Sequence, residues 1–151
     1  MPSLTLVMGI PAAGKTTHAR HLAEATGAEL LSTDLLRRDR SIDRGDFLRG
    51  VDIAGADILA QGRSVIVDSC ASRWRERSGW LGIARGYCAG ATLVIMHCPL
   101  SIAIQRNSLR AFPVPENMIK LYHRRMIIEL PKIIHEGWDS ILHNANVNSE
   151  W

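Results

Sequence analysis

Hydrophobic positions gather along this chain in short runs that are separated by amphipathic stretches. The runs predict buried strands at residues 4–9, 28–33, 64–69 and 91–98, with a weaker fifth candidate at 140–147. The stretches between them predict helices at residues 15–26, 46–60, 73–87, 99–109 and 115–135. Strands that alternate with helices and are apolar almost throughout favour an α/β fold, with a parallel sheet covered by helices on both faces.

Two further expectations follow from this alternation. Pro115 suits the first turn of the last helix, whereas Pro131 is expected to bend or break it near its end. Ligands of parallel sheets bind at the carboxyl ends of the strands. That rule selects residues 9–17, 32–38 and 68–73, and the chain from Cys98 onward.

Composition narrows the class of protein. Of the 151 residues, 46% are hydrophobic and 22% are charged, which is typical of one globular domain. No apolar run is long enough to cross a membrane, and the first residues lack the pattern of a secretory signal. Cys70, Cys88 and Cys98 form neither a metal-binding spacing nor a disulfide framework. We therefore expect a cytoplasmic protein without a membrane partner.

The cations are nearly all arginine, since Lys15, Lys120 and Lys132 are the only lysines. Arginine suits phosphate recognition, although codon bias also produces such a surplus. The arginines gather in the segments 73–77, 106–110 and 124–125, within a chain of net charge +3. Charge gathered in this way favours a surface for an anionic partner.

The segment GIPAAGKT, residues 9–16, matches the phosphate-loop pattern G-x-x-x-x-G-K-[ST] between a predicted strand and a predicted helix. Its glycines let successive N–H groups turn toward a phosphate, and the following helix directs its positive end to the same place. Lys15 would reach the outer phosphates, and the Thr16 hydroxyl would bind Mg²⁺. The predicted ATP-binding residues of this loop are Gly9, Ala12, Ala13, Gly14, Lys15, Thr16 and Thr17.

An acidic residue is also expected near the metal. Asp68 ends a predicted strand and is the candidate, either bound to Mg²⁺ directly or through water. The alternative interpretation is that Asp68 caps the next helix.

Three classes of protein use such a loop. The sequence lacks the N-K-x-D stretch of a GTPase, and it has no room for the larger domain of a mechanical ATPase. A small kinase needs a base for the acceptor hydroxyl, and Asp34 follows the second strand at the required edge. Arg37 lies one turn further and suits an anionic acceptor group. Alternatively, Asp34 is a helix cap and Arg37 a solvated residue.

Arg106 and Arg110 stand four positions apart, which places them on one face of a predicted helix. The sequence AFPVP then interrupts the helical pattern, so residues 106–118 form a candidate lid. An arginine that a lid brings onto the transferring phosphoryl group would be catalytic. A solvated helix face is the alternative.

The motifs GIPAAGKTT, STDLLR, VIVDS, RNSLR and VP…LPKIIHEGWD resemble, in this order, 5′-hydroxyl polynucleotide kinases of the bacteriophage type. The resemblance spans Leu4 to about Ile141, and a looser one extends to gluconate, shikimate and adenylate kinases. It implies a P-loop kinase fold, a three-layer sandwich around a five-stranded parallel sheet of order 2-3-1-4-5. It also implies that Asp34 is the general base and that Arg37 holds the phosphate 3′ of the acceptor nucleotide. Arg106 and Arg110 would hold ATP, with one of them acting on the transition state.

The sequence departs from this family in two respects. Ser69 and Cys70 stand where the family often has a polar pair ending in Asn or Thr, and we expect no 3′-phosphatase domain. The resulting hypothesis is a single-domain, ATP- and Mg²⁺-dependent kinase of DNA or RNA 5′ ends, working in the host cytoplasm if the chain is of phage origin. The alternatives are a small-molecule kinase and a nucleotide-binding module that hydrolyses ATP slowly.

Overall fold

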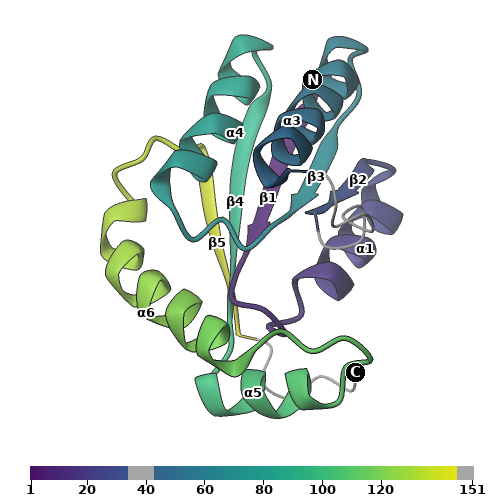
Figure 1. Ribbon diagram of the computed structural model, residues 1–151. Coiled ribbons are helices and arrows are strands. Elements are labelled where there is room, and N and C mark those ends of the chain that lie inside the picture. Colours follow the sequence, from purple (N-terminus) through teal and green to yellow (C-terminus); the bar gives the residue numbers. More distant parts are fainter. Residues whose placement is uncertain (34–42, 146–151) are drawn as a thin grey trace.

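The computed structural model describes residues 1–33 and 43–145 (Figure 1). Its strands are β1 (Ser3–Met8), β2 (Glu29–Ser32), β3 (Val65–Asp68), β4 (Gly90–His97) and β5 (Ser140–Ala145). Its helices are α1 (Lys15–Thr26), α3 (Arg44–Ala60), α4 (Trp74–Gly86), α5 (Leu100–Ser108) and α6 (Glu116–Ile133). Every predicted strand and helix is thus present within the described residues.

The strands form one parallel sheet of five strands in the order β2-β3-β1-β4-β5. The central strand β1 is held in place by apolar burial, because Leu4, Leu6 and Val7 are completely inaccessible to solvent. In the register of the sheet, Val7 pairs with Asp68 of β3 and with Val94 of β4. The carboxyl ends of the central strands are therefore level with one another. The predicted P-loop kinase fold is confirmed.

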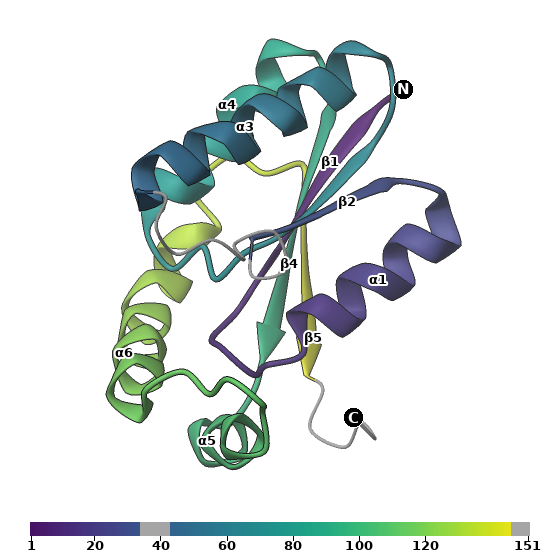
Figure 2. The ribbon, with the colours of Figure 1, turned by 45° about the vertical axis from the view of Figure 1, so that its right-hand side comes forward.

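The helices complete three layers (Figure 2). Helix α1 packs against β1, β2 and β3 on one face of the sheet, and α3 and α4 cover the other face. Helix α5 lies beyond the carboxyl ends of the strands, and α6 runs up from there on the side of α3 and α4. The carboxyl ends of the strands therefore point toward the end of the molecule where α5 lies.

The ends of two helices differ from the predictions. Helix α3 begins at Arg44 rather than at residue 46, because the Asp43 carboxylate accepts hydrogen bonds from the Gly45 and Asp46 N–H groups at 2.9 and 3.2 Å. Helix α6 passes through Pro131 and ends at Ile133. Pro131 lacks the N–H that would bond the carbonyl of Ile127, and Ile127 is exposed, so water can bond that carbonyl instead.

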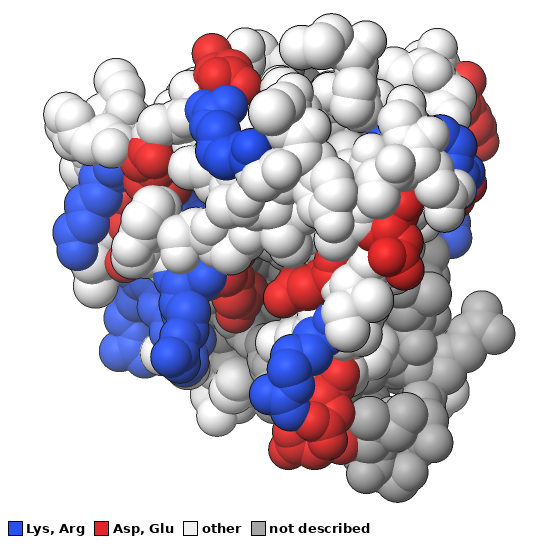
Figure 3. Space-filling model, turned by 90° about the horizontal axis from the view of Figure 1, so that it is seen from above, with Lys and Arg blue, Asp and Glu red and all other residues white. Residues whose placement is uncertain are grey.

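The end of the molecule formed by the amino ends of the strands carries mixed charge. Seen from that end, acidic and basic side chains are interspersed, and several basic side chains adjoin one another at the lower left (Figure 3). Ion pairs such as Arg85 with Asp139 and Arg63 with Glu29 account for this mixture. Within the described ranges, no helix has the length and apolar character that a bilayer crossing requires.

Candidate active site

The loop between β1 and α1 has the backbone of an anion-binding turn. Ala12 and Gly14 both have positive φ angles, 64° and 91°, and Gly14 is the N-cap of α1. Left-handed residues beside right-handed ones turn successive N–H groups to one side of the chain, where an anion can bind them. The amino end of α1, from Lys15 onward, adds its helix dipole at the same place.

Gly9 is required by close packing rather than by its φ angle. A Cβ at this position would lie 3.0 Å from both the Cβ and the carbonyl oxygen of Met96 on β4. Because the contact with Met96 is partly backbone, it cannot be relieved by a change of side-chain rotamer. The first glycine of the motif therefore lets the loop cross directly over the end of β4.

We expect Gly9→Ala to destabilise the protein by about 1–3 kcal/mol, the usual cost of overpacking a filled site. The measurement is chemical denaturation without nucleotide. Gly50→Ala is the matched control, because no atom of the described residues lies within 4 Å of a Cβ at Gly50 on α3. Alanine is favoured over glycine inside a helix, so Gly50→Ala should stabilise slightly. Equal stability of the two variants would contradict the packing explanation.

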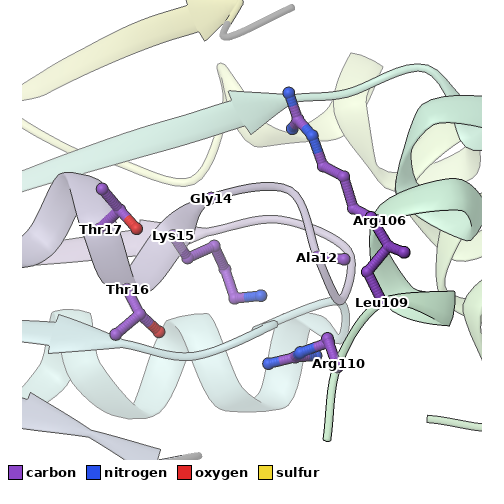
Figure 4. A pocket seen from close by; sticks show the side chains of 8 residues that line it. All are labelled: Ala12, Gly14, Lys15, Thr16, Thr17, Arg106, Leu109 and Arg110. Atoms are coloured by element: carbon purple, nitrogen blue, oxygen red, sulfur yellow. The ribbon is translucent and has the colours of Figure 1, made fainter. Parts of the chain in front are cut away.

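Lys15 is held over the loop, with only 4% of its surface exposed. Its Nζ donates a hydrogen bond to the carbonyl oxygen of Ile10 at 3.1 Å. The side chain runs along the loop from the first residue of α1, and its amino group points toward Ala12 and Arg110 (Figure 4). The ammonium group is thus held over the loop, where Lys15 also lines a cavity.

Asp68 lies at the centre of a hydroxyl cluster. Its Oδ2 accepts hydrogen bonds from Thr16 Oγ1 at 2.5 Å and from Ser32 Oγ at 2.7 Å, and its carbonyl oxygen accepts one from Thr33 Oγ1 at 3.1 Å. Its other carboxylate oxygen, Oδ1, is buried and has no hydrogen-bond partner among the residues that the structure describes. A buried, unpartnered carboxylate oxygen beside a threonine hydroxyl fits the needs of Mg²⁺, which prefers oxygen ligands. The alternative role as a helix cap is wrong, because the N-cap of α4 is Arg73.

A cavity of about 320 Å³ opens between the loop and the end of α5. On the loop and α1 side it is lined by Ala12, Gly14, Lys15, Thr16 and Thr17. On the other side it is lined by Arg106, Leu109 and Arg110 (Figure 4). Residues that stand far apart in the sequence are thus brought around one space, which is bordered by three cationic side chains.

The two cavity arginines are placed differently from the prediction. Arg106 lies in the last turn of α5, but that helix ends at Ser108, so Arg110 lies in the turn beyond it rather than on the same helix. Arg106 Nη1 donates to Cys98 Sγ at 3.7 Å. Burial raises the pKa of the Cys98 thiol, although Arg106 opposes this shift, so the thiol stays neutral.

The turn after α5 is fastened by a residue that the sequence did not single out. Asn107 is only 5% exposed; its Nδ2 donates to the Val114 carbonyl at 2.7 Å, and its Oδ1 accepts from the Val114 N–H at 2.9 Å. This pair closes the segment that carries Arg110. An asparagine that precedes a proline-rich stretch was the available signal.

Asp34 and Arg37 lie outside the described residues, so the predicted base and acceptor contact remain predictions. The residues just before them do belong to the site. Ser32 and Thr33, at the end of β2, both bond to Asp68 and hold this strand end beside its carboxylate.

The arginine segment 73–77 does not form one surface. Arg77 is completely buried, which removes it from any surface for an anionic partner. Arg73, Trp74 and Arg75 are exposed at the start of α4, whereas Trp80 is 5% exposed and packs in the core. His18 and His21 belong to no metal cluster, since the described residues hold no group of three or more metal-ligating side chains.

A family model with the description AAA domain matches residues 4–131, which is most of the chain. The chain belongs to the AAA domain family. This AAA domain is a P-loop nucleotide-binding domain, in agreement with the loop geometry described above. No curated protein sequence matches it.

Solved structures share the fold of this AAA domain at low sequence identity. A gluconokinase from Sinorhizobium meliloti has a TM-score of 0.71 and 20% identity, with 98% of this chain and 85% of that chain covered. Kti12 of Chaetomium thermophilum, solved with ADP-AlF3, has a TM-score of 0.76 and 20% identity, with 97% and 91% covered. A chain of the Pnkp1/Rnl/Hen1 RNA repair complex has a TM-score of 0.76 and 18% identity, with 87% and 46% covered. The P-loop kinase fold therefore has both small-molecule and RNA-repair relatives.

Proposed function

We propose that this AAA domain is an ATP- and Mg²⁺-dependent phosphotransferase that phosphorylates the 5′-hydroxyl ends of DNA or RNA. One observation carries the kinase part of the proposal. The cavity joins the phosphate loop and Lys15 to two arginines, and Thr16, on its wall, bonds to the buried carboxylate of Asp68. Phosphoryl transfer needs this combination, because catalysis rests on positioning and on neutralising charge.

Each residue of the cavity then has one role. The loop N–H groups and Lys15 bind the β- and γ-phosphates. Thr16 and Asp68 would hold Mg²⁺, which neutralises charge on the phosphate oxygens. The turn that carries Arg110 is the proposed lid, residues 106–118, and Arg110 would stabilise the transferring phosphoryl group while Arg106 holds the nucleotide.

The acceptor is assigned to nucleic acid on three grounds. The motif order resembles polynucleotide kinases, and the RNA repair complex shares the fold with a TM-score of 0.76. The third ground is the start of α4, where Trp74 is 47% exposed between the exposed Arg73 and Arg75. An aromatic ring flanked by cations suits a stacked base and its neighbouring phosphates. In this assignment Asp34 accepts the proton of the 5′-hydroxyl, and Arg37 binds the adjacent phosphate.

A small hydroxyl compound is the second candidate acceptor. The gluconokinase covers 98% of this chain with a TM-score of 0.71, so the fold alone serves a sugar acid equally well. The chemistry of donor, metal and base would be the same, and only the contacts to the acceptor would differ.

The test is transfer from γ-labelled ATP with Mg²⁺ to matched acceptors. These are 5′-hydroxyl DNA and RNA oligonucleotides, the same oligonucleotides with a 5′-phosphate, and a panel of sugar acids and nucleosides. We expect label only on the 5′-hydroxyl oligonucleotides. Label confined to small compounds would establish the second candidate, and hydrolysis without any transfer would show a nucleotide-hydrolysing module instead.

A further inference from the structure

Arg77 on α4 is the largest fully buried side chain among the described residues, and its donors are satisfied by three partners. Nη1 donates to the carbonyl oxygen of Ala71 at 2.9 Å. Nη2 donates to Glu129 at 2.6 Å and to Glu136 at 2.7 Å, and Nε donates to both oxygens of Glu136 at 3.1 Å. Burial lowers the pKa of Arg77, but these carboxylates outweigh it and raise the pKa above its usual value.

The hydrogen bond from Arg77 to the Ala71 carbonyl holds residues 69–71, which follow Asp68 in the chain. Ala71 has a φ angle of 47°, an unfavourable conformation for alanine that its surroundings must maintain. On the side of the phosphate loop, the Ser69 N–H donates to Val7 at 3.2 Å and the Gly9 N–H donates to Cys70 at 3.4 Å. On the opposite side, Arg77 holds the Ala71 carbonyl. Hydrogen bonds therefore hold residues 69–71, which follow the proposed metal ligand Asp68, on both sides.

The other hydrogen bonds of Arg77 reach the helix that follows the proposed lid. Glu129 lies on α6, whose first turn belongs to residues 106–118, and Glu136 lies just after that helix. Trp138 Nε1 donates to Glu136 at 3.0 Å and holds this second carboxylate in place. Arg77 thus joins the Asp68–Ala71 segment, through a hydrogen bond, to the helix at the lid, through charged hydrogen bonds.

From this geometry we propose that Arg77 is a positioning residue for the metal-bound nucleotide. It keeps the segment behind Asp68 in the conformation that presents Oδ1 to Mg²⁺, and it ties that conformation to the position of α6. The inference rests on the proposed function in so far as it concerns Mg²⁺-ATP. Arg77 touches neither nucleotide nor acceptor and acts only through Asp68.

A role in fold stability alone would be a weaker explanation of this network. Burying an ion pair costs desolvation energy that its attraction seldom exceeds, and apolar replacements of similar volume are often as stable. Arg77 also donates a hydrogen bond to the carbonyl oxygen of Ala71, which has a left-handed backbone conformation. An apolar side chain could not form this bond and so could not hold Ala71 in that conformation. Groups that orient metal ligands in this way typically affect metal affinity or activity by about 10- to 100-fold.

The test compares Arg77→Lys with Arg85→Lys. Both arginines lie on α4 and pair with residues after α6, but Arg85 is exposed and bonds to Asp139 and Gly137, away from Asp68. Lysine keeps the positive charge but lacks the planar guanidinium group that can donate hydrogen bonds to several partners at once. ATP binding is measured by calorimetry in EDTA and in rising Mg²⁺, together with the Mg²⁺ dependence of the transfer rate.

We expect Arg77→Lys to bind ATP in EDTA as the wild type does, and to need about 10- to 100-fold more Mg²⁺ for half-maximal binding and rate. Arg85→Lys should leave the Mg²⁺ response unchanged. An equal response of both variants would overturn the proposal.

If Arg77→Lys does not fold, Glu129→Gln replaces it, because this variant weakens only the contact of Arg77 with α6. Glu129→Gln must then also raise the Mg²⁺ requirement, and an unchanged requirement would again overturn the proposal. A wild-type protein that binds Mg²⁺-ATP but transfers no phosphate would refute the proposed function instead, and the binding comparison would still decide the role of Arg77.

Discussion

Arg110→Ala is expected to lower kcat by about 10³- to 10⁵-fold while changing ATP affinity much less, because an arginine on the transferring phosphoryl group acts mainly in the transition state. Arg110 lines the cavity from the turn after α5, opposite Lys15 and Thr16 (Figure 4). The two hydrogen bonds between Asn107 and the Val114 backbone hold the turn that carries Arg110, so the backbone of this turn needs little ordering when the nucleotide binds.

The measurement separates binding from chemistry. ATP affinity is determined by calorimetry, and the transfer rate is determined under saturating ATP and acceptor. Arg124→Ala is the matched control, because Arg124 is exposed on α6 and its loss changes the net charge by the same amount. We expect the control to retain wild-type kcat. A wild-type kcat in Arg110→Ala would refute the role of this turn as a catalytic lid.

The parts of the molecule that the sequence predicted depend on local patterns. The apolar runs give the strands because each must be buried on both faces, and the spacing from Gly9 to Thr16 gives the phosphate loop. The position of Asp68 at the end of an apolar run predicted that it lies at the carboxyl edge of the sheet, and the structure places it there as the last residue of β3. The order of the strands came from the family resemblance, since short apolar runs do not say which strands are neighbours.

The parts that the sequence could not predict depend on distant partners. Arg73, Arg75 and Arg77 look alike in the sequence, yet only Arg77 meets two carboxylates, and those stand 52 and 59 positions further along the chain. A helical pattern says which residues share a face but not which acid will lie opposite them. The same holds for Ser32, whose bond to Asp68 joins two strands that the sequence separates by 36 positions.

Asp34→Asn is expected to lower the transfer rate by about 10²- to 10⁴-fold, the usual contribution of a general base, without weakening ATP binding. Asp34 lies outside the described residues, but Ser32 and Thr33 just before it are bonded to Asp68 at 2.7 and 3.1 Å. In the sequence, Asp34 therefore comes directly after a strand end that is bonded to the proposed metal ligand Asp68. Asparagine keeps the size of the side chain and cannot accept the proton.

The decisive comparison is between transfer and hydrolysis in the same variant. Asp57→Asn serves as the control, because Asp57 is exposed on α3 and its loss removes the same charge. In a kinase, Asp34 is needed to activate the acceptor hydroxyl, so Asp34→Asn should lose transfer to the 5′ end while Asp57→Asn keeps it. In a module that only hydrolyses ATP, no acceptor is activated, and Asp34→Asn would leave ATP turnover at the wild-type rate. Because both variants share the charge change, loss of transfer in Asp34→Asn alone would support the proposed role of Asp34 as the base, and equal transfer by both variants would refute it.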